Sequence, residues 1–405
     1  MARRRWAIIL GIPIAFLAVA LEYLINVGAA NPPQFVKQYL MPLFLVAIVL
    51  TSLVAQVAGG KWPPDKLLGG VWAVMLIAAV VIAAAVAARP NIRPPVSAHL
   101  CNLTPSVESP IVECSIPTPA SHPSGIIVAP DGSIWFLERS GNKVGHLSLQ
   151  GKFSEFAIPT PASSPDTIVW GPDDAIWFTE QDGNKIGRLS LAGKFTEYQL
   201  PTPASGPTGI TTGQDRELWF TERDGNKIGR MATDGGLVEY QIPTPAAKPE
   251  RIVIGPDNNS WFVERVSGKI GTMSATGYFR EFALPDASSS PDGIVVGADD
   301  NLWFTEQSAN LIGRVTTGGD ITEFRVPTPG SIPTFIAAGP DHALWFTEAY
   351  RDRIGRTTTS GLFSEFAVPT ADSIPADLMA DASGNIWFTE KNGNNIGRLM
   401  PPVAG

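Results

Sequence analysis

The sequence predicts an all-β fold, a seven-bladed β-propeller with four strands in each 42-residue blade. The dipeptide Trp-Phe occurs seven times, and every interval between two copies is 42 residues. The tryptophans are Trp135, Trp177, Trp219, Trp261, Trp303, Trp345 and Trp387. Repeats of about 40–45 residues that contain several short β-type runs are typical of propeller blades.

One repeat divides into four predicted strands, over 125–129, 133–137, 142–147 and 153–157. Trp, Phe, Ile and Val dominate these runs, and Gly, Pro, Asp and Asn separate them, as strands and tight turns require. The turn Pro130-Asp131-Gly132 connects the first strand to the second.

The last repeat ends near Met400 without an outer strand, and residues 112–114 lie one period before the outer strand of the first repeat. We therefore expect the strand Ile111–Ile116 to complete the seventh blade, so that 111–405 is one closed domain. Closure of this kind leaves only short, protected edges.

Residues 1–88 form a predicted membrane anchor with three transmembrane helices, 6–25, 39–57 and 70–88. Each apolar run is about long enough to cross a hydrocarbon core of ~30 Å. Glu22 lies near the end of the first run, where its side chain can reach the interface. A functional carboxylate inside the membrane is the alternative for this residue.

Basic residues predict the orientation of this anchor. Three arginines precede the first span, and Lys61 and Lys66 lie between the second and the third, whereas the first loop has only Lys37. This asymmetry places the N-terminus in the cytoplasm and the propeller outside it. A cleaved signal peptide that ends near residues 27–30 is an alternative, and it leaves the propeller on the same side.

A proline-rich linker, 89–110, follows the anchor. Cys101 and Cys114 are the only two cysteines of the chain. An even number of cysteines in an oxidising compartment predicts a disulfide between them, and two free thiols are the alternative.

Charge is distributed unevenly along the chain. Residues 111–405 contain 22 Lys and Arg against 35 Asp and Glu, a formal charge of −13, whereas residues 1–110 have a formal charge of +5. Because an acidic domain repels phosphate backbones, we expect no nucleic-acid partner.

A residue that recurs in every repeat is expected to stabilise the blade, so we expect the Trp-Phe pairs in the core between blades. A glutamate follows two residues after each pair: Glu138, Glu180, Glu222, Glu264, Glu306, Glu348 and Glu390. Arginines of the third strand, such as Arg188 and Arg230, are expected to pair with these glutamates. A ring of metal-binding carboxylates is the alternative.

Positions that vary between repeats are free to bind a ligand. They follow the proline that opens the first strand and the end of the second strand, which antiparallel pairing brings to one face. We expect a ligand-binding funnel at this mouth of the central channel, and a solvated mouth without a ligand is the alternative. The funnel residues are Asp166, Thr208, Glu250, Arg251, Asp292, Thr334, Phe335, Tyr350, Arg351 and Asp377, with Arg139, Gln181, Arg223, Arg265, Gln307 and Lys391 beside them.

The recurring run Trp-Phe-Thr-Glu, Gly-Asn-Lys-Ile-Gly-Arg, Glu-Phe/Tyr and Pro-Thr-Pro-Ala resembles the virginiamycin B lyase (streptogramin lyase) family over about residues 111–400. The resemblance implies a seven-bladed propeller. It also implies a Mg²⁺-dependent lyase that opens a cyclic depsipeptide antibiotic by removing an α-proton and eliminating the ester oxygen. The motif is less specific for that activity because it reports how blades pack.

The family's catalytic histidines follow the proline that opens the first strand in the last two blades. Thr334 and Ala376 occupy those positions here, so the catalytic set does not carry over. His122 is the only histidine expected on the funnel face, and with Asp377 or Asp166 it is a candidate base. A surface loop histidine is the alternative.

These observations favour a membrane-anchored, extracytoplasmic propeller that binds a small molecule or a protein at its funnel. The first alternative is a Mg²⁺-dependent lyase with a rearranged site, and Mg²⁺ is the expected cofactor only in that case. The second alternative is a structural scaffold.

Overall fold

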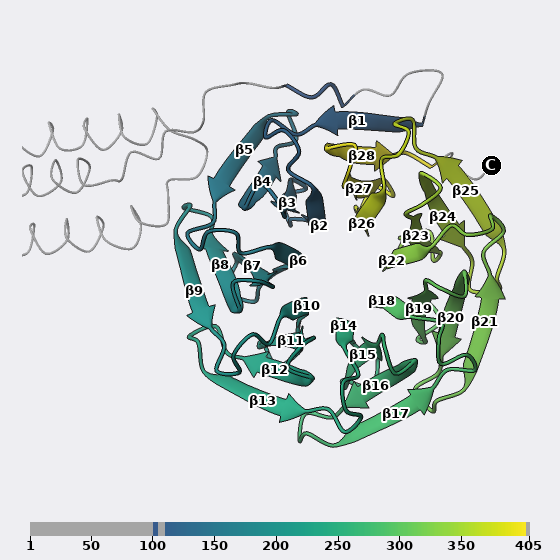
Figure 1. Cartoon of the computed structure of the whole chain (residues 1–405). Coiled ribbons are helices and arrows are strands. Elements are labelled where there is room, and N and C mark those ends of the chain that lie inside the picture. The colour runs from purple at the N-terminus through teal and green to yellow at the C-terminus, as the bar shows by residue number, and fades with distance from the viewer. Residues whose placement is uncertain (1–99, 104–109, 402–405) are drawn as a thin grey trace, which may run out of the picture. The chain divides into compact units, whose positions relative to one another are not determined.

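The computed structural model describes residues 100–103 and 110–401, and it contains seven four-stranded antiparallel sheets arranged as a ring (Figure 1). The strands are β1 (Ile111–Ser115), β2 (Pro123–Val128), β3 (Ile134–Glu138), β4 (Lys143–Leu147), β5 (Phe153–Ala157), β6 (Pro165–Trp170), β7 (Ala175–Glu180), β8 (Lys185–Ser190), β9 (Phe195–Gln199), β10 (Pro207–Thr212), β11 (Leu218–Glu222), β12 (Lys227–Met231), β13 (Leu237–Gln241), β14 (Pro249–Ile254), β15 (Ser260–Glu264), β16 (Lys269–Met273), β17 (Phe279–Ala283), β18 (Pro291–Val296), β19 (Leu302–Glu306), β20 (Leu311–Val315), β21 (Ile321–Arg325), β22 (Pro333–Ala338), β23 (Leu344–Glu348), β24 (Arg353–Thr357), β25 (Phe363–Ala367), β26 (Pro375–Ala380), β27 (Ile386–Glu390) and β28 (Asn395–Leu399). The predicted all-β, seven-bladed propeller is confirmed.

Blades one to six each consist of four consecutive strands, from β2–β5 to β22–β25, and the seventh combines β26, β27 and β28 with β1. In Figure 1 the first strand of each blade lies nearest the centre of the ring, and the fourth lies at its outer edge. The predicted spans 6–25, 39–57 and 70–88 lie outside the described residues, as does most of the predicted linker 89–110. Within the two described ranges, no helix has the length and apolar character needed to cross a membrane.

The ring closes through β1, which pairs antiparallel with β28 and places Ile111 opposite Leu399 (Figure 1). A disulfide joins Cys114 of β1 to Cys101, and their Cα atoms are 5.3 Å apart. The Cys101 amide also donates to the carbonyl of Gly151 in the first blade (2.8 Å). Cys101 is therefore attached to the first blade as well as to the seventh.

Burial of the Trp-Phe pair explains the Ile-Gly that recurs on the third strand. Phe220 is 0% exposed and lies over Gly229, where an added Cβ would be 2.1 Å from the ring Cζ. The same contact recurs in all seven blades, at Gly145, Gly187, Gly229, Gly271, Gly313, Gly355 and Gly397. Only glycine lets the phenylalanine ring lie flat against this strand, so the repeat retains it.

The threonine of Trp-Phe-Thr-Glu joins neighbouring blades. Thr221 Oγ1 accepts a hydrogen bond from the Gly209 amide of its own blade (2.9 Å) and donates to the Glu250 carbonyl of the next (2.5 Å). Thr179, Thr305, Thr347 and Thr389 likewise donate to a carbonyl of the following blade. These buried hydroxyls connect successive first strands around the channel.

At the outer edge, a second polar contact explains the Pro-Thr-Pro and Asn-Lys motifs. Lys185 Nζ bonds both Thr160 Oγ1 (2.6 Å) and Glu197 (2.9 Å), and the Thr160 amide donates to the same carboxylate (2.9 Å). Since Thr160 belongs to the connection from the preceding blade, this cluster ties one blade to the next.

The expected pairing between the ring of glutamates and the third-strand arginines is wrong. Strand pairing places Arg188 opposite Trp177, whereas Glu180 is opposite Lys185. Arg188 therefore stacks on the indole of Trp177 and pairs with Asp173 (2.6 Å). The glutamates are instead fully buried, and in the described part of the chain neither carboxyl oxygen of Glu138, Glu180, Glu222, Glu306 or Glu348 has a hydrogen-bond partner.

Candidate functional site

The funnel begins at a bulge that recurs in every blade. In the fourth blade the register between β14 and β15 shifts between Pro249 and Ile252, so Glu250 and Arg251 are left out of the regular ladder. Bulges of this kind redirect side chains next to functional sites. The same shift occurs in the other six blades, after the proline that opens each first strand.

Arg251 is the centre of one polar network at the channel mouth. Its guanidinium pairs with Asp166 of the second blade (2.8 Å), which also pairs with Arg139 of the first blade (2.7 Å). The same guanidinium lies 4.2 Å from the ring centroid of Phe335 in the sixth blade, a close cation–π contact. Arg251 thus connects blades that are not neighbours in the ring.

A second network surrounds Glu250 and Asp292. Arg223 Nε lies 3.0 Å from Glu250, and Arg265 lies 3.8 Å from Glu250 and 3.6 Å from Asp292. Gln307 donates to Asp292 and accepts from Arg265. These residues come from the third, fourth and fifth blades, so the two networks together run along much of the mouth.

Burial changes the charge that these acids carry. Desolvation, with a smaller contribution from Asp292, raises the pKa of Glu250 to about 7, and desolvation raises the pKa of Asp377 to about 7. Burial acts in the same direction on Asp166, but Arg251 and Arg139 hold the pKa of that carboxyl below its ordinary value. Near pH 7 the four arginines therefore outweigh the ionised acids.

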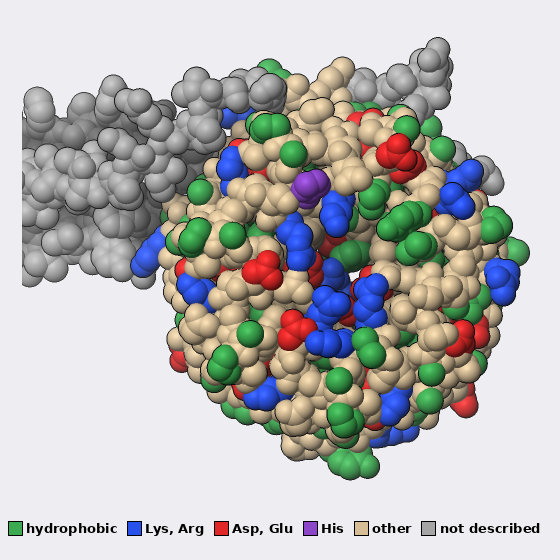
Figure 2. All heavy atoms as spheres, viewed as in Figure 1, with side chains coloured by type: hydrophobic (Ala, Val, Ile, Leu, Met, Phe, Trp, Pro, Cys, Tyr) green, Lys and Arg blue, Asp and Glu red, His purple; other side chains and the backbone are tan. Residues whose placement is uncertain are grey.

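The arginine side chains of the funnel are more exposed to solvent than its carboxyl groups. The side chains of Arg139, Arg223 and Arg265 are about a third exposed (31, 36 and 31%), whereas those of Asp166 and Glu250 are 14% and 8% exposed. Figure 2 shows Lys and Arg side chains gathered around the central opening on this face. The mouth therefore presents hydrogen-bond donors to a ligand, with carboxyl groups behind them.

Other predicted funnel residues lie apart from these networks. The hydroxyls of Thr208 and Thr334 bond Thr221 and Thr347 inside the blades. Tyr350 is 64% exposed, and Arg351 Nε donates to the carbonyl of Pro329 on a surface loop.

Asp377 and His122 have local partners. The carboxylate of Asp377 accepts hydrogen bonds from the amides of Ile126 and Leu378. His122 Nδ1 lies 2.8 Å from Ser140 Oγ in an exposed contact. Within residues 110–401, no hydrogen bond links His122 to Asp166 or Asp377.

Nothing in the described ranges gathers three His, Cys, Asp or Glu side chains closely enough to hold a metal ion. The seven glutamates of the ring, the alternative metal site, do not form such a group within these ranges. The carboxyl groups of the funnel are engaged with arginines or amides instead.

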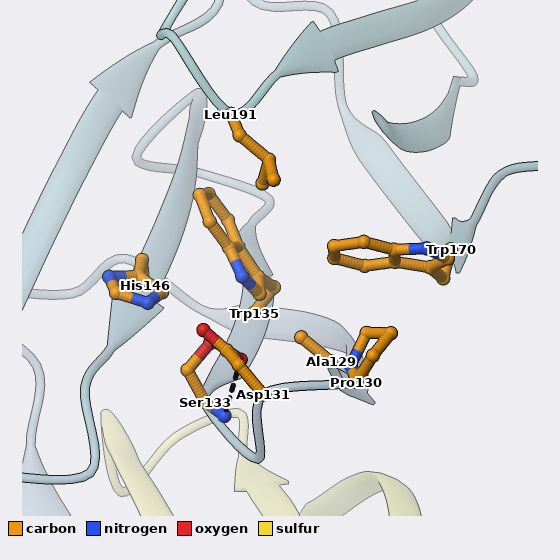
Figure 3. Close-up of a pocket in the computed structure, with 8 residues that line it drawn as sticks. All are labelled: Ala129, Pro130, Asp131, Ser133, Trp135, His146, Trp170 and Leu191. Carbon is orange, nitrogen blue, oxygen red and sulfur yellow. Dashed lines mark hydrogen bonds between the residues drawn. The ribbon is translucent and has the colours of Figure 1, made fainter. Parts of the chain in front are cut away.

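A second concave site was not predicted from the sequence. It is a cavity of about 230 Å³ at the junction of the first and second blades, lined by Ala129, Pro130, Asp131, Ser133, Trp135, His146, Trp170 and Leu191 (Figure 3). The signal for it was present: His146 stands where most repeats have arginine, and Ala129 where five repeats have glycine.

A family model for the virginiamycin B lyase family matches residues 103–302 and 255–403. The structure resembles that of virginiamycin B lyase from Staphylococcus aureus, with 38% identity over 72% of this chain and 99% of that one, and a TM-score of 0.70. A catalytically inactive histidine-to-alanine variant of the Staphylococcus aureus enzyme with quinupristin matches equally well (38% identity, 72% and 99% coverage, TM-score 0.70).

Hydrazine synthase from Kuenenia stuttgartiensis shares the fold alone, at 14% identity over 71% of this chain and 98% of that one, with a TM-score of 0.60. No curated relative matches the chain significantly.

Proposed function

Because the chain belongs to the virginiamycin B lyase family, we propose that its propeller is a ligand-binding member of that family which recognises a small molecule at the funnel. One observation carries this proposal. Positions that vary from blade to blade supply Arg139, Asp166, Arg223, Glu250 and Arg251, and these side chains meet in networks at one mouth of the channel. A ligand with carboxylate or carbonyl oxygens suits the exposed arginine donors.

The residues that replace the family's catalytic histidines favour binding without catalysis. The Staphylococcus aureus enzyme needs a histidine, since its histidine-to-alanine variant is described as catalytically inactive. Thr334 and Ala376 stand at the positions where the resemblance places histidines in this chain. A hydroxyl that is bonded within the blade and a methyl group cannot accept a proton from a substrate carbon.

The proposal includes a location. The propeller lies outside the cytoplasm and is held to the membrane by the three apolar segments of residues 1–88, oriented by the basic residues around them. The disulfide between Cys101 and Cys114 supports an oxidising compartment.

The experiment that separates binding from catalysis uses the full-length protein with Mg²⁺ and virginiamycin B. Elimination gives a linear isomer of unchanged mass, so the reaction is followed by reversed-phase chromatography with mass detection. We expect saturable binding in calorimetry and no linear product. Turnover above a protein-free control that is lost in His122→Ala would establish the lyase alternative instead.

The funnel itself is tested by Arg223→Gln. This change removes an exposed donor, and we expect it to weaken virginiamycin B binding at least about tenfold, as loss of a charge-assisted hydrogen bond does. Arg280→Gln, on the outer strand β17, is the matched control and is expected to bind as the unaltered protein does. Equal affinities for the two variants would mean that the ligand site lies elsewhere.

A further inference from the structure

The cavity between the first two blades lies at the end of the strands opposite the funnel, next to the turn that joins β2 to β3. Figure 3 shows Trp135 and Trp170 on either side of the open space, with Leu191 at one end and the turn residues Pro130 and Asp131 at the other. At about 230 Å³ it is smaller than the ~300–1,000 Å³ of pockets for drug-sized ligands, so it fits one compact chemical group.

Other blades show that an indole and a turn aspartate together can hold a guanidinium group. In the second blade the Arg188 guanidinium lies 5.7 Å from the centroid of Trp177 and pairs with Asp173 (2.6 Å). The third, fifth and sixth blades repeat the arrangement: Arg230 with Trp219 and Asp215, Arg314 with Trp303 and Asp299, and Arg356 with Trp345 and Asp341. An indole face and a turn aspartate thus hold a guanidinium four times among the described residues.

The first blade retains the aspartate and the tryptophan but replaces the arginine. His146 lies opposite Trp135 in the strand register and packs against it, with ring centroids 4.4 Å apart and the ring planes tilted by 42°. Burial lowers the pKa of His146, so the imidazole is neutral near pH 7 and supplies no fixed cation. The shorter ring also reaches less far than an arginine side chain.

Ala129 changes the position of the indole. Five blades have glycine at this place, and an added Cβ at Gly171 would lie 2.2 Å from Trp177 Cδ1. In the other six blades the indole N–H donates to an aspartate of the turn, or of the position before it. Trp135 makes no such bond among the residues described, and Asp131 accepts from Ser133 instead (2.9 and 2.6 Å).

Two features found only in the first two blades complete the cavity. Trp170 ends β6, and the equivalent residues of the neighbouring first strands are Val128 and Thr212. Leu191, 58% exposed, adds an apolar wall. A second indole therefore faces the space beside Trp135, and two aromatic faces with a nearby carboxylate are the elements of a cation–π site.

We propose that this cavity binds the guanidinium group of an external ligand, with the group between Trp135 and Trp170 and paired with Asp131. Figure 3 shows His146, which holds the position of those arginines, on the side of Trp135 away from Trp170, so the ligand would use the other face of the indole and share only the turn aspartate with the arrangement of the four other blades. The site is independent of the funnel, so its occupation does not depend on the function proposed above.

Titration of the full-length protein with ethylguanidinium chloride tests the proposal, with tryptophan fluorescence and indole NMR signals as readouts. We expect saturable binding, and at least tenfold weaker binding of ethylurea, which has a similar shape without the charge. Asp131→Asn is expected to weaken ethylguanidinium binding at least tenfold. Absence of saturable binding by the unaltered protein would overturn the proposal.

His146→Arg is the decisive variant because it gives the first blade the residue of its neighbours. We expect the new guanidinium to pair with Asp131, as the equivalent arginines pair with the turn aspartate in four other blades, and so to abolish ethylguanidinium binding by occupying its counterion and to raise the melting temperature. His342→Arg adds the same charge to an exposed turn of the sixth blade and is expected to leave binding unchanged. If His146→Arg binds ethylguanidinium as tightly as the unaltered protein, the assignment of the cavity is wrong.

The tripeptide Gly-Arg-Gly distinguishes the two possible sources of the guanidinium group, a polypeptide and a free small molecule. Tighter binding of this peptide than of ethylguanidinium identifies an arginine side chain of a polypeptide as the ligand. Equal or weaker binding of the peptide identifies a free small molecule, provided that His146→Arg abolishes both interactions.

Discussion

At the scale of single residues, the repeat is explained by contacts that allow one residue type only. The glycine of the third strand is the clearest case, because the phenylalanine of the second strand occupies the place of a Cβ. Protein interiors are packed as densely as organic crystals, so an added methyl group has no free space there.

Gly229→Ala tests this packing. The new Cβ would lie 2.1 Å from Phe220 Cζ, and we expect a loss of about 1–3 kcal/mol in the free energy of unfolding. Gly236→Ala is the matched control, since its nearest neighbour would be 3.4 Å away. The measurement is thermal or urea unfolding of both variants. Equal stabilities would show that the phenylalanine ring moves aside without cost.

At the scale of elements, the seventh blade depends on a strand from the other end of the chain. Cys101 and β1 are held by the disulfide, by the hydrogen bond from the Cys101 amide to the Gly151 carbonyl and by the pairing of β1 with β28. A disulfide that closes a loop of about 15 residues contributes roughly 3 kcal/mol, mainly by restricting the unfolded chain.

Replacing both cysteines by serine is therefore expected to lower the free energy of unfolding by about 2–4 kcal/mol. The unaltered protein should lose a similar amount of stability when a reductant is added, and the double variant should not respond to it. The measurement is the unfolding midpoint with and without dithiothreitol. A double variant as stable as the oxidised protein would mean that strand pairing alone secures β1.

At the scale of the whole molecule, the seven buried glutamates form a ring of acids whose protonation affects stability. Burial raises the pKa of each of them to about 7 or 8. The folded state therefore binds more protons than the unfolded state between about pH 4.5 and pH 8. Across this window the free energy of unfolding contributed by the ring falls as the pH rises.

Glu306→Gln isolates one member of the ring, because glutamine resembles the protonated acid and cannot ionise. We expect the variant to gain stability relative to the unaltered protein as the pH rises from 5 to 8. With a pKa near 7 and about 1.4 kcal/mol for each pKa unit, the gain is at most about 3 kcal/mol.

The measurement for Glu306→Gln is the unfolding midpoint at half-unit pH intervals. Asp300→Asn, which alters an exposed carboxyl, is the control and is expected to follow the unaltered protein. Parallel profiles for all three proteins would show that Glu306 does not remain protonated in the folded state.

The fold was predictable because each blade repeats the same short-range pattern. The strand predicted over 153–157 matches β5, while β2 begins two residues before the predicted 125–129 because its opening proline already pairs with Glu138. The site was only partly predictable. The position of Glu250 and Arg251 in the repeat predicts that they belong to the site, but it does not predict the ion-pair partner of Arg251.

Asp166 is 85 positions from Arg251 in the sequence, and only the curvature of the ring brings the two together. The prediction that the third-strand arginines pair with the ring of glutamates was wrong for a related reason. A register of one strand against another decides whether Arg188 meets Glu180 or Asp173, and composition alone does not reveal it.

The closing strand also has consequences for the order of synthesis. Ser115 bonds Asn395, a residue 280 positions later, so β1 leaves the ribosome long before its partner exists. At about 5–20 residues per second, this strand edge waits on the order of tens of seconds. The disulfide spans only 13 positions and can form during that wait. Early oxidation would then hold β1 next to Cys101 until the last blade has been synthesised.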